Sequence, residues 1–205
     1  MIDLLCLVAD KNMEAVASRL LDRPESLGIR RVTREIVVHD RRDPGCFHHA
    51  GDILLGYRSR AAHALVILDH AWGGVPAETA VEVEGLLEGR FRRDGMGDWA
   101  RAVVIQPELE AWVFSGSPHV ESALGWSGRS PGLREALTAQ RLWAPGSDKP
   151  DDPKKAMEWA LVQRRLPRSS SIYRELASKV STRSCTDRAF QRLRRLLQEW
   201  FPPTG

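Results

Sequence analysis

Cysteine is scarce in this chain of 205 residues, and the few that occur do not form a recognisable pattern. The three are Cys6, Cys46 and Cys185, an odd number with wide spacings and no CxxC pair. A disulfide framework and a zinc knuckle both need paired cysteines, so the sequence favours neither. Adjacent His48 and His49 follow Cys46 but would point apart, which does not suit a zinc site. We therefore expect reduced thiols and a cytoplasmic protein.

Long apolar runs are also missing. Stretches such as Ala64–Leu68 are far shorter than the ~20 residues that span a bilayer. The first apolar run has no basic segment before it, and Asp3 and Asp10 interrupt it. This is not the pattern of a signal peptide, and we expect no membrane partner.

Phosphate-binding glycine motifs and a serine nucleophile motif are absent as well. Neither GxxxxGK[ST] nor GxGxxG occurs, so nucleotide binding by a phosphate loop is not predicted. Ser115, Ser117 and the serines at 169–171 lack the context of a nucleophile elbow. With 42% hydrophobic and 28% charged residues, the chain has an ordinary globular composition, which excludes a fibrous or wholly disordered protein.

Short apolar runs alternate with helical patterns through the first half of the chain. The runs are apolar at consecutive positions, as in strands covered on both faces, and helices are predicted between them. This order predicts an α/β fold with an open, mostly parallel sheet, in which the run at 64–68 is central. The predicted strands are Leu4–Val8, Glu35–Val38, Ala64–Leu68 and Ala102–Ile105, and the predicted helices are Met13–Leu21 and Ala77–Phe91.

The second half has a different organisation. Residues 126–153 are rich in Gly, Pro and Ser and form a predicted connector with a short helix at Leu133–Leu142. Residues 154–205 are predicted to form a basic helical extension packed on an α/β core of residues 1–125. Its predicted helices are Lys154–Leu166, Ile172–Val180 and Arg188–Trp200, the last capped by Thr186 or Asp187.

Charge is divided unevenly between these parts. Residues 151–205 hold 12 Lys and Arg against 6 Asp and Glu, whereas residues 1–150 hold 18 against 21. A basic segment on an acidic body suits a polyanion partner such as nucleic acid, and the alternative is a solvated helical surface.

A carboxylate follows each predicted strand: Asp10, Asp40, Asp69 and then Glu108, with Glu110 two residues further on. The ends of parallel strands meet at one edge of the sheet, where ligands bind in α/β folds. Crowded carboxylates repel one another unless a cation compensates them. Oxygen ligands favour Mg²⁺ or Mn²⁺, so we predict a site for one or two such ions.

Each carboxylate also has a simpler interpretation. Asp10 can cap the helix that follows it, and Asp40 and Asp43 can belong to a surface ion-pair loop with the neighbouring arginines. Pro107 is predicted to begin a helix through Val113, which would point Glu108 and Glu110 in nearly opposite directions.

Three motifs together resemble the Toprim-like fold of small bacterial proteins: VADKNME at 8–14, VILDH at 66–70 and PELEAW at 107–112. The closing segment CTDRAFQRLRRLLQEW is similar to the last helix of those proteins. RRDPGC at 41–46 and LPRSSSIY at 166–173 resemble a component of methylation-associated phage-defence systems.

The resemblance implies a Mg²⁺-dependent centre that cuts or rejoins phosphodiesters. Asp69, Glu108 and Asp10 would be the catalytic and metal-binding residues, with Glu14, His70 and Glu110 in supporting positions. Ala71 stands where the family has a second aspartate, which weakens two-metal chemistry.

Two functions are therefore expected. The first is a metal-dependent nuclease-like protein of antiphage defence. The second is a non-catalytic Toprim-like module that binds nucleic acid or other defence proteins. In both, basic side chains would hold the nucleic-acid backbone: Arg41, Arg42, Lys154, Lys155, Arg164, Arg165 and Arg168.

Overall fold

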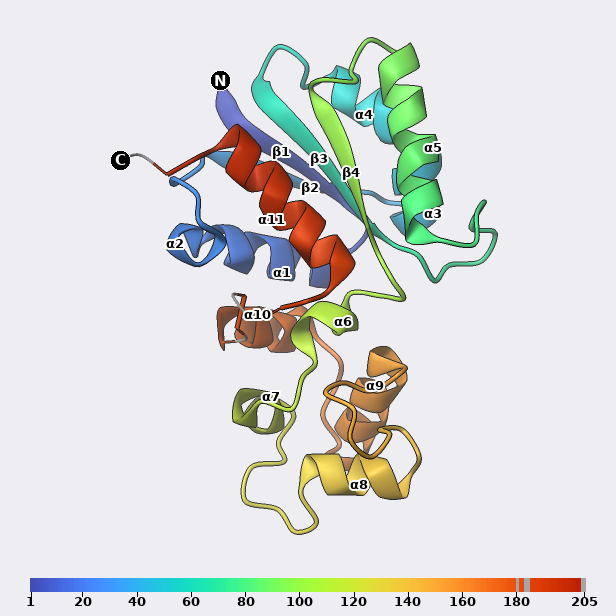
Figure 1. Ribbon diagram of the computed structural model, residues 1–205, viewed down its shortest axis with the longest axis vertical. Helices are drawn as coiled ribbons and strands as arrows, with labels where there is room; N and C mark the ends of the chain where they lie inside the picture. Colours follow the sequence, from blue (N-terminus) through green and yellow to red (C-terminus); the bar gives the residue numbers. More distant parts are fainter. Residues whose placement is uncertain (180, 183–184, 204–205) are drawn as a thin grey trace.

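The computed structural model describes residues 1–179, 181–182 and 185–203. In these residues four strands form one parallel sheet with the order β2-β1-β3-β4 (Figure 1). The predicted open α/β architecture is confirmed, and β3 is one of the two central strands. The strands are β1 (Ile2–Val8), β2 (Arg34–Val38), β3 (Ala61–Asp69) and β4 (Ala100–Ile105).

Helices cover both faces of the sheet (Figure 1). One face is covered by α1 (Lys11–Leu21) and α11 (Arg188–Trp200), and the other by α3 (Arg42–His48), α4 (Ala50–Leu55) and α5 (Ala80–Arg93). Coverage on both sides explains why the middle of β1 and β3 is apolar at every position, since successive side chains point to opposite faces.

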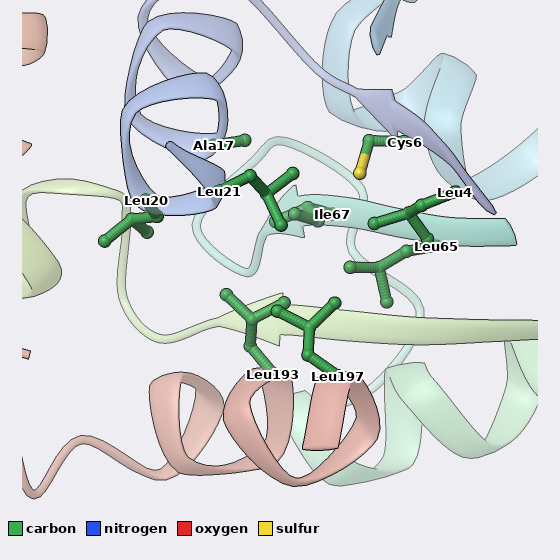
Figure 2. A pocket seen from close by; sticks show the side chains of 9 residues that line it. All are labelled: Leu4, Cys6, Ala17, Leu20, Leu21, Leu65, Ile67, Leu193 and Leu197. Carbon is green, nitrogen blue, oxygen red and sulfur yellow. The ribbon is translucent and has the colours of Figure 1, made fainter. Parts of the chain in front are cut away.

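The core between α1, α11 and the sheet is tightly filled. Figure 2 shows aliphatic side chains of both helices meeting Leu4, Cys6, Leu65 and Ile67 of the sheet around a void of about 10 Å³. A void of this size could hold at most one water, and apolar walls offer that water no hydrogen bond. The void is therefore a packing gap and not a ligand site.

The remaining helices range from 4 to 11 residues in length. α2 (Pro24–Leu27) follows α1. Beyond the carboxyl ends of the strands lie the segments that we call the helical lobe (Figure 1). They are α6 (Glu110–Val113), α7 (Pro118–Ala123), α8 (Leu133–Ala139), α9 (Pro153–Gln163) and α10 (Ser170–Lys179). α10 also packs on α1, which joins the helical lobe to the core.

Helix ends follow the capping residues of the sequence. α11 has the predicted bounds, and Asp187 caps it by accepting the N–H of Phe190 at 2.9 Å. α10 ends at Lys179, and Val180, the last residue of the predicted helix, lies outside the described residues. No helix in the described part of the chain is long and apolar enough to cross a membrane.

One predicted helix start is wrong. Pro107 does not begin a helix: the Gln106–Pro107 peptide bond is cis, and α6 starts only at Glu110. The carbonyl of Pro107 instead accepts the N–H of Ala71 at 3.0 Å. The segment after β4 therefore binds the loop after β3 through this hydrogen bond. The long-range contact overrides the preference of proline for the first turn of a helix.

Candidate functional site

The candidate site lies at the carboxyl edge of the sheet, between β1 and β3. The chain leaves β1 toward β2 on one side and then returns across β1 to β3. Such a reversal of strand order separates the following helices and opens a crevice where ligands bind. Asp10 follows β1 and Asp69 is the last residue of β3, so the fold places these two predicted residues on either side of the crevice.

Asp69 has the most unusual environment of these carboxylates. Its Oδ1 atom is buried and has no hydrogen-bond partner among the described residues. Burial raises the pKa of Asp69 well above its ordinary value, and the negative charges of Asp43, Glu110, Glu108 and Asp10 raise it further. An unpaired buried carboxylate oxygen is costly, and a bound cation would remove both the missing contact and the repulsion.

Asp43 lies beside Asp69 and is half-buried, so the interpretation of it as part of a surface loop is wrong. It lies in the first turn of α3, where its Oδ1 accepts the backbone N–H of Asp69 at 2.8 Å. Burial raises the pKa of Asp43, and the charges of Asp10 and Glu108 add to the effect. The RRDPGC motif includes Asp43, but a local motif does not indicate how closely α3 approaches the end of β3.

Asp10 caps α1, as its simpler interpretation predicted. Its Oδ1 accepts the N–H groups of Asn12 and Met13, both at 2.9 Å. Its other oxygen, Oδ2, has no hydrogen-bond partner among the residues described. Capping therefore leaves one oxygen of Asp10 available to a ligand.

Asp40 lies apart from the buried carboxylates. Its side chain is 85% exposed, and Oδ1 lies 2.9 Å from Nδ1 of His39, in keeping with the surface interpretation. Asp40 and Asp10 are on the wall of an open pocket of about 400 Å³ at the ends of β1 and β2. Lys11 and Arg42 line the same pocket, so it has both cationic and anionic walls.

The two carboxylates after β4 are paired with cations from the helical lobe. Glu108 forms an ion pair with Nζ of Lys154 in α9. Glu110 is 1% exposed and accepts hydrogen bonds from Arg168 at 2.8 Å and from the hydroxyl of Tyr173. Glu110 is thus paired with a basic side chain of the C-terminal segment.

These ion pairs shift the pKa values of the groups near the end of β4. Burial raises the pKa of Glu110, while Tyr173 and Arg168 oppose that effect. Burial alone would lower the pKa of Lys154, but its hydrogen bond with Glu108 raises the value above the ordinary one. The carboxylates thus divide into a paired set, Glu108 and Glu110, and a set without a cationic partner in the described residues, Asp10, Asp43 and Asp69.

The other supporting residues are held by neighbours. Nε2 of His70 lies 3.2 Å from the carbonyl oxygen of Ala77, and Glu14 forms an ion pair with Lys11 at 2.9 Å. Neither contact brings the side chain to Asp69.

The oxygen ligands at this edge suit Mg²⁺ or Mn²⁺ rather than a softer metal. The described residues hold no group of three His, Cys, Asp or Glu side chains already arranged to ligate an ion. The orphaned oxygen of Asp69 nevertheless fits a hard cation, because the neighbouring carboxylates repel one another around it. Asp69, Asp43 and the free oxygen of Asp10 are the groups that could hold such an ion.

The predicted nucleic-acid contacts are of two kinds. Lys154 and Arg168 are paired with carboxylates, and Nε of Arg164 donates to the carbonyl of Gly125 at 3.0 Å. The others are exposed and form no ion pair with the residues that the structure describes: Arg41, Arg42, Lys155 and Arg165.

No protein-family model, curated protein or solved structure matches this chain. Function is therefore inferred from the geometry and chemistry of the carboxyl edge.

Proposed function

We propose that this protein is a divalent-metal-dependent, nuclease-like protein that acts on phosphodiesters of nucleic acid. The observation that carries the proposal is the buried, unpartnered Oδ1 of Asp69 among carboxylates that raise its pKa. Fixed negative charge without a partner destabilises a folded protein, so its presence at the ligand-binding edge of the sheet supports a cation site.

Asp69, Asp43 and Asp10 would hold the ion. Glu108 was expected among the ligands, but its ion pair with Lys154 favours Asp43 in its place. When bound, Mg²⁺ or Mn²⁺ supplies a Lewis acid for a phosphoryl oxygen and favours the ionised form of a bound water. The chain itself would orient the carboxylates: α1 fixes Asp10 through its cap, and Asp69 fixes Asp43 through its backbone N–H.

Nucleic acid is the proposed substrate because exposed cations border the same edge. Arg42 lines the pocket beside Asp10, and Arg41 is exposed next to it. Guanidinium groups bind phosphate oxygens through charge-assisted hydrogen bonds without reading sequence. A role in bacterial antiphage defence follows the resemblance of the sequence motifs and forms part of the same proposal.

The proposal is tested by calorimetric titration of the apo protein with Mn²⁺, followed by a nuclease assay on single- and double-stranded DNA and RNA. Asp69→Asn, Asp43→Asn and Asp10→Asn should each weaken Mn²⁺ binding and abolish cleavage. Asp40→Asn is the matched control, since it removes the same charge from the same edge at an exposed position. Equal Mn²⁺ affinity in all four variants and the wild type would contradict the metal site.

The second candidate is a module that binds nucleic acid or defence proteins without catalysis. The internal neutralisation of Glu108 and Glu110 by Lys154 and Arg168 favours it, because half of a possible two-metal site is already occupied. Nucleic-acid binding that persists in EDTA, without Mn²⁺ binding or cleavage, would support this candidate.

A further inference from the structure

Lys154 occupies a position that local structure does not favour. It is the second residue of α9, an 11-residue helix that begins at Pro153 and is capped by Asp152. The first turn of a helix carries partial positive charge, so a cation there is disfavoured by the helix dipole. The ion pair with Glu108 offsets this cost for Lys154, whereas Lys155 in the same turn has no such partner in the described residues.

The contact places an ammonium group at the carboxyl edge. The Glu108 side chain is 14% exposed and the Lys154 side chain 34%. Glu108 and Lys154 are 46 residues apart, so the contact depends on how the helical lobe packs against the loop after β4. Lys155, the next residue, is exposed and forms no such pair in the described part of the chain.

The residue at position 71 adds an independent observation. Ala71 lies two residues after Asp69 and has no carboxylate. Its backbone N–H donates a hydrogen bond to the carbonyl of Pro107. The end of β3 therefore offers Asp69 to a ligand, and the β4 loop offers Glu108 already joined to a cation.

We propose that Lys154 is a tethered cation that takes the place of a second divalent ion at Glu108, so that the site binds a single ion on the Asp10, Asp43 and Asp69 side. This inference rests on the proposed metal site and specifies its stoichiometry. Lys154 is a positioning residue in this scheme, since it acts by occupying Glu108.

The test counts Mn²⁺ ions per chain by calorimetry and by the electron paramagnetic resonance signal of free Mn²⁺. Lys154→Met removes the ammonium group and keeps a long side chain. Lys155→Met removes the same charge one residue away, and Lys154→Arg keeps the charge. We expect one ion in the wild type, in Lys155→Met and in Lys154→Arg. Lys154→Met should bind a second ion, or bind the first about tenfold more tightly, because Glu108 is released.

A second variant keeps the test decisive if Lys154→Met folds poorly without metal. Glu108→Gln should leave the count at one Mn²⁺ ion per chain in the otherwise wild-type protein, because Glu108 holds no ion there. The double variant Lys154→Met with Glu108→Gln should lose the second ion.

The outcomes separate the two proposals. One ion in the wild type and the same count and affinity in Lys154→Met would overturn the role of Lys154 and leave the metal site standing. A large loss of affinity in Glu108→Gln would also overturn it, by making Glu108 a ligand. No Mn²⁺ binding by the wild type or by Lys154→Met would reject the metal site and this inference together.

Discussion

The carboxyl group of Asp69 opposes folding at neutral pH when no cation is bound. Burial and neighbouring carboxylates raise its pKa in the folded protein, whereas in the unfolded chain it ionises near the ordinary value of about 3.9. Between the ordinary pKa and the raised one, the folded state therefore holds a proton that the unfolded state has released. Stability falls with rising pH wherever the folded state binds more protons.

We predict that Asp69→Asn flattens this pH dependence. The wild-type free energy of unfolding should include a contribution that is fully present below about pH 4 and declines as pH rises through the raised pKa. At pH 7 and without metal, Asp69→Asn should be more stable than the wild type by roughly 1–3 kcal/mol, because the neutral amide is not repelled by the carboxylates around it. Urea unfolding of both proteins from pH 4.5 to 8 in EDTA measures the difference.

Asp40→Asn provides the control for this prediction, because Asp40 is exposed and its substitution should change the profile little. If the free energy of unfolding varied with pH in the same way in the wild type and in Asp69→Asn, the Asp69 carboxyl group would not destabilise the folded protein.

Single residues also show which parts of the site a sequence pattern can predict. Asp10 and Asp69 were found because strand ends are visible as the ends of apolar runs, and their convergence follows from a parallel sheet. Asp43 was assigned to the surface because its burial depends on α3 packing against β3, 26 residues away in sequence. Local patterns predict an element, but not which side chains a neighbouring element covers.

At the scale of elements, side chains of two helices bind backbone groups of the edge strand β4 that have no neighbouring strand to pair with. Glu84 and Glu88 of α5 accept the N–H groups of Val104 and Ala102, at 2.9 and 3.0 Å. Arg188 and Arg192 of α11 donate to the carbonyl groups of the same two residues, at 3.1 and 2.9 Å. Four residues along a helix rise about 6 Å and two along a strand about 6.6 Å, so the spacings match.

The glutamates and arginines also bind one another. Both guanidinium nitrogens of Arg188 donate to Glu84 at 2.9 Å, and Arg192 donates to Glu88 at 2.6 Å. This arrangement satisfies an edge that could otherwise pair with another chain. The sequence predicted α5 and α11 but not this contact, because its partners are 104 residues apart.

We predict that Glu84→Ala destabilises the protein by about 2–4 kcal/mol. The change leaves the buried N–H of Val104 without its acceptor and Arg188 without its partner. It should also promote concentration-dependent association, because the edge of β4 becomes available for pairing. Thermal unfolding and sedimentation velocity at several concentrations measure the two effects.

Glu78→Ala is the matched control, since Glu78 is an exposed glutamate just before α5. A monomeric Glu84→Ala variant with wild-type stability would show that the side chains do not seal the edge.

At the scale of the whole molecule, four of the twelve Lys and Arg residues of the segment 151–205 pair with carboxylates of the α/β core. Lys154, Arg168, Arg188 and Arg192 all form ion pairs with glutamates of residues 84–110. Composition therefore identified a real asymmetry but could not show that part of it joins the basic segment to the acidic body. The α/β class followed from the order of strands and helices, whereas the position of the helical lobe depends on these long-range pairs.

Exposed cations rather than total charge should therefore determine affinity for nucleic acid. Arg41 and Arg42 are exposed beside the carboxyl edge, whereas Arg92 and Arg93 are exposed at the end of α5. That end precedes β4 and so lies toward the opposite edge of the sheet (Figure 1). The two pairs carry equal charge at different places.

We predict that Arg41→Ala with Arg42→Ala weakens binding to DNA and reduces its salt dependence. Each lost phosphate contact should lower the slope of log affinity against log salt by about 0.7 for single strands or 0.9 for duplexes. Two lost contacts therefore correspond to a change of about 1.4–1.8, measurable by fluorescence anisotropy over a range of NaCl concentrations. Arg92→Ala with Arg93→Ala should leave the slope close to the wild-type value, because those side chains lie at the end of α5, away from the carboxyl edge. Equal effects of the two double variants would mean that DNA responds to net charge alone and that the carboxyl edge is not its binding site.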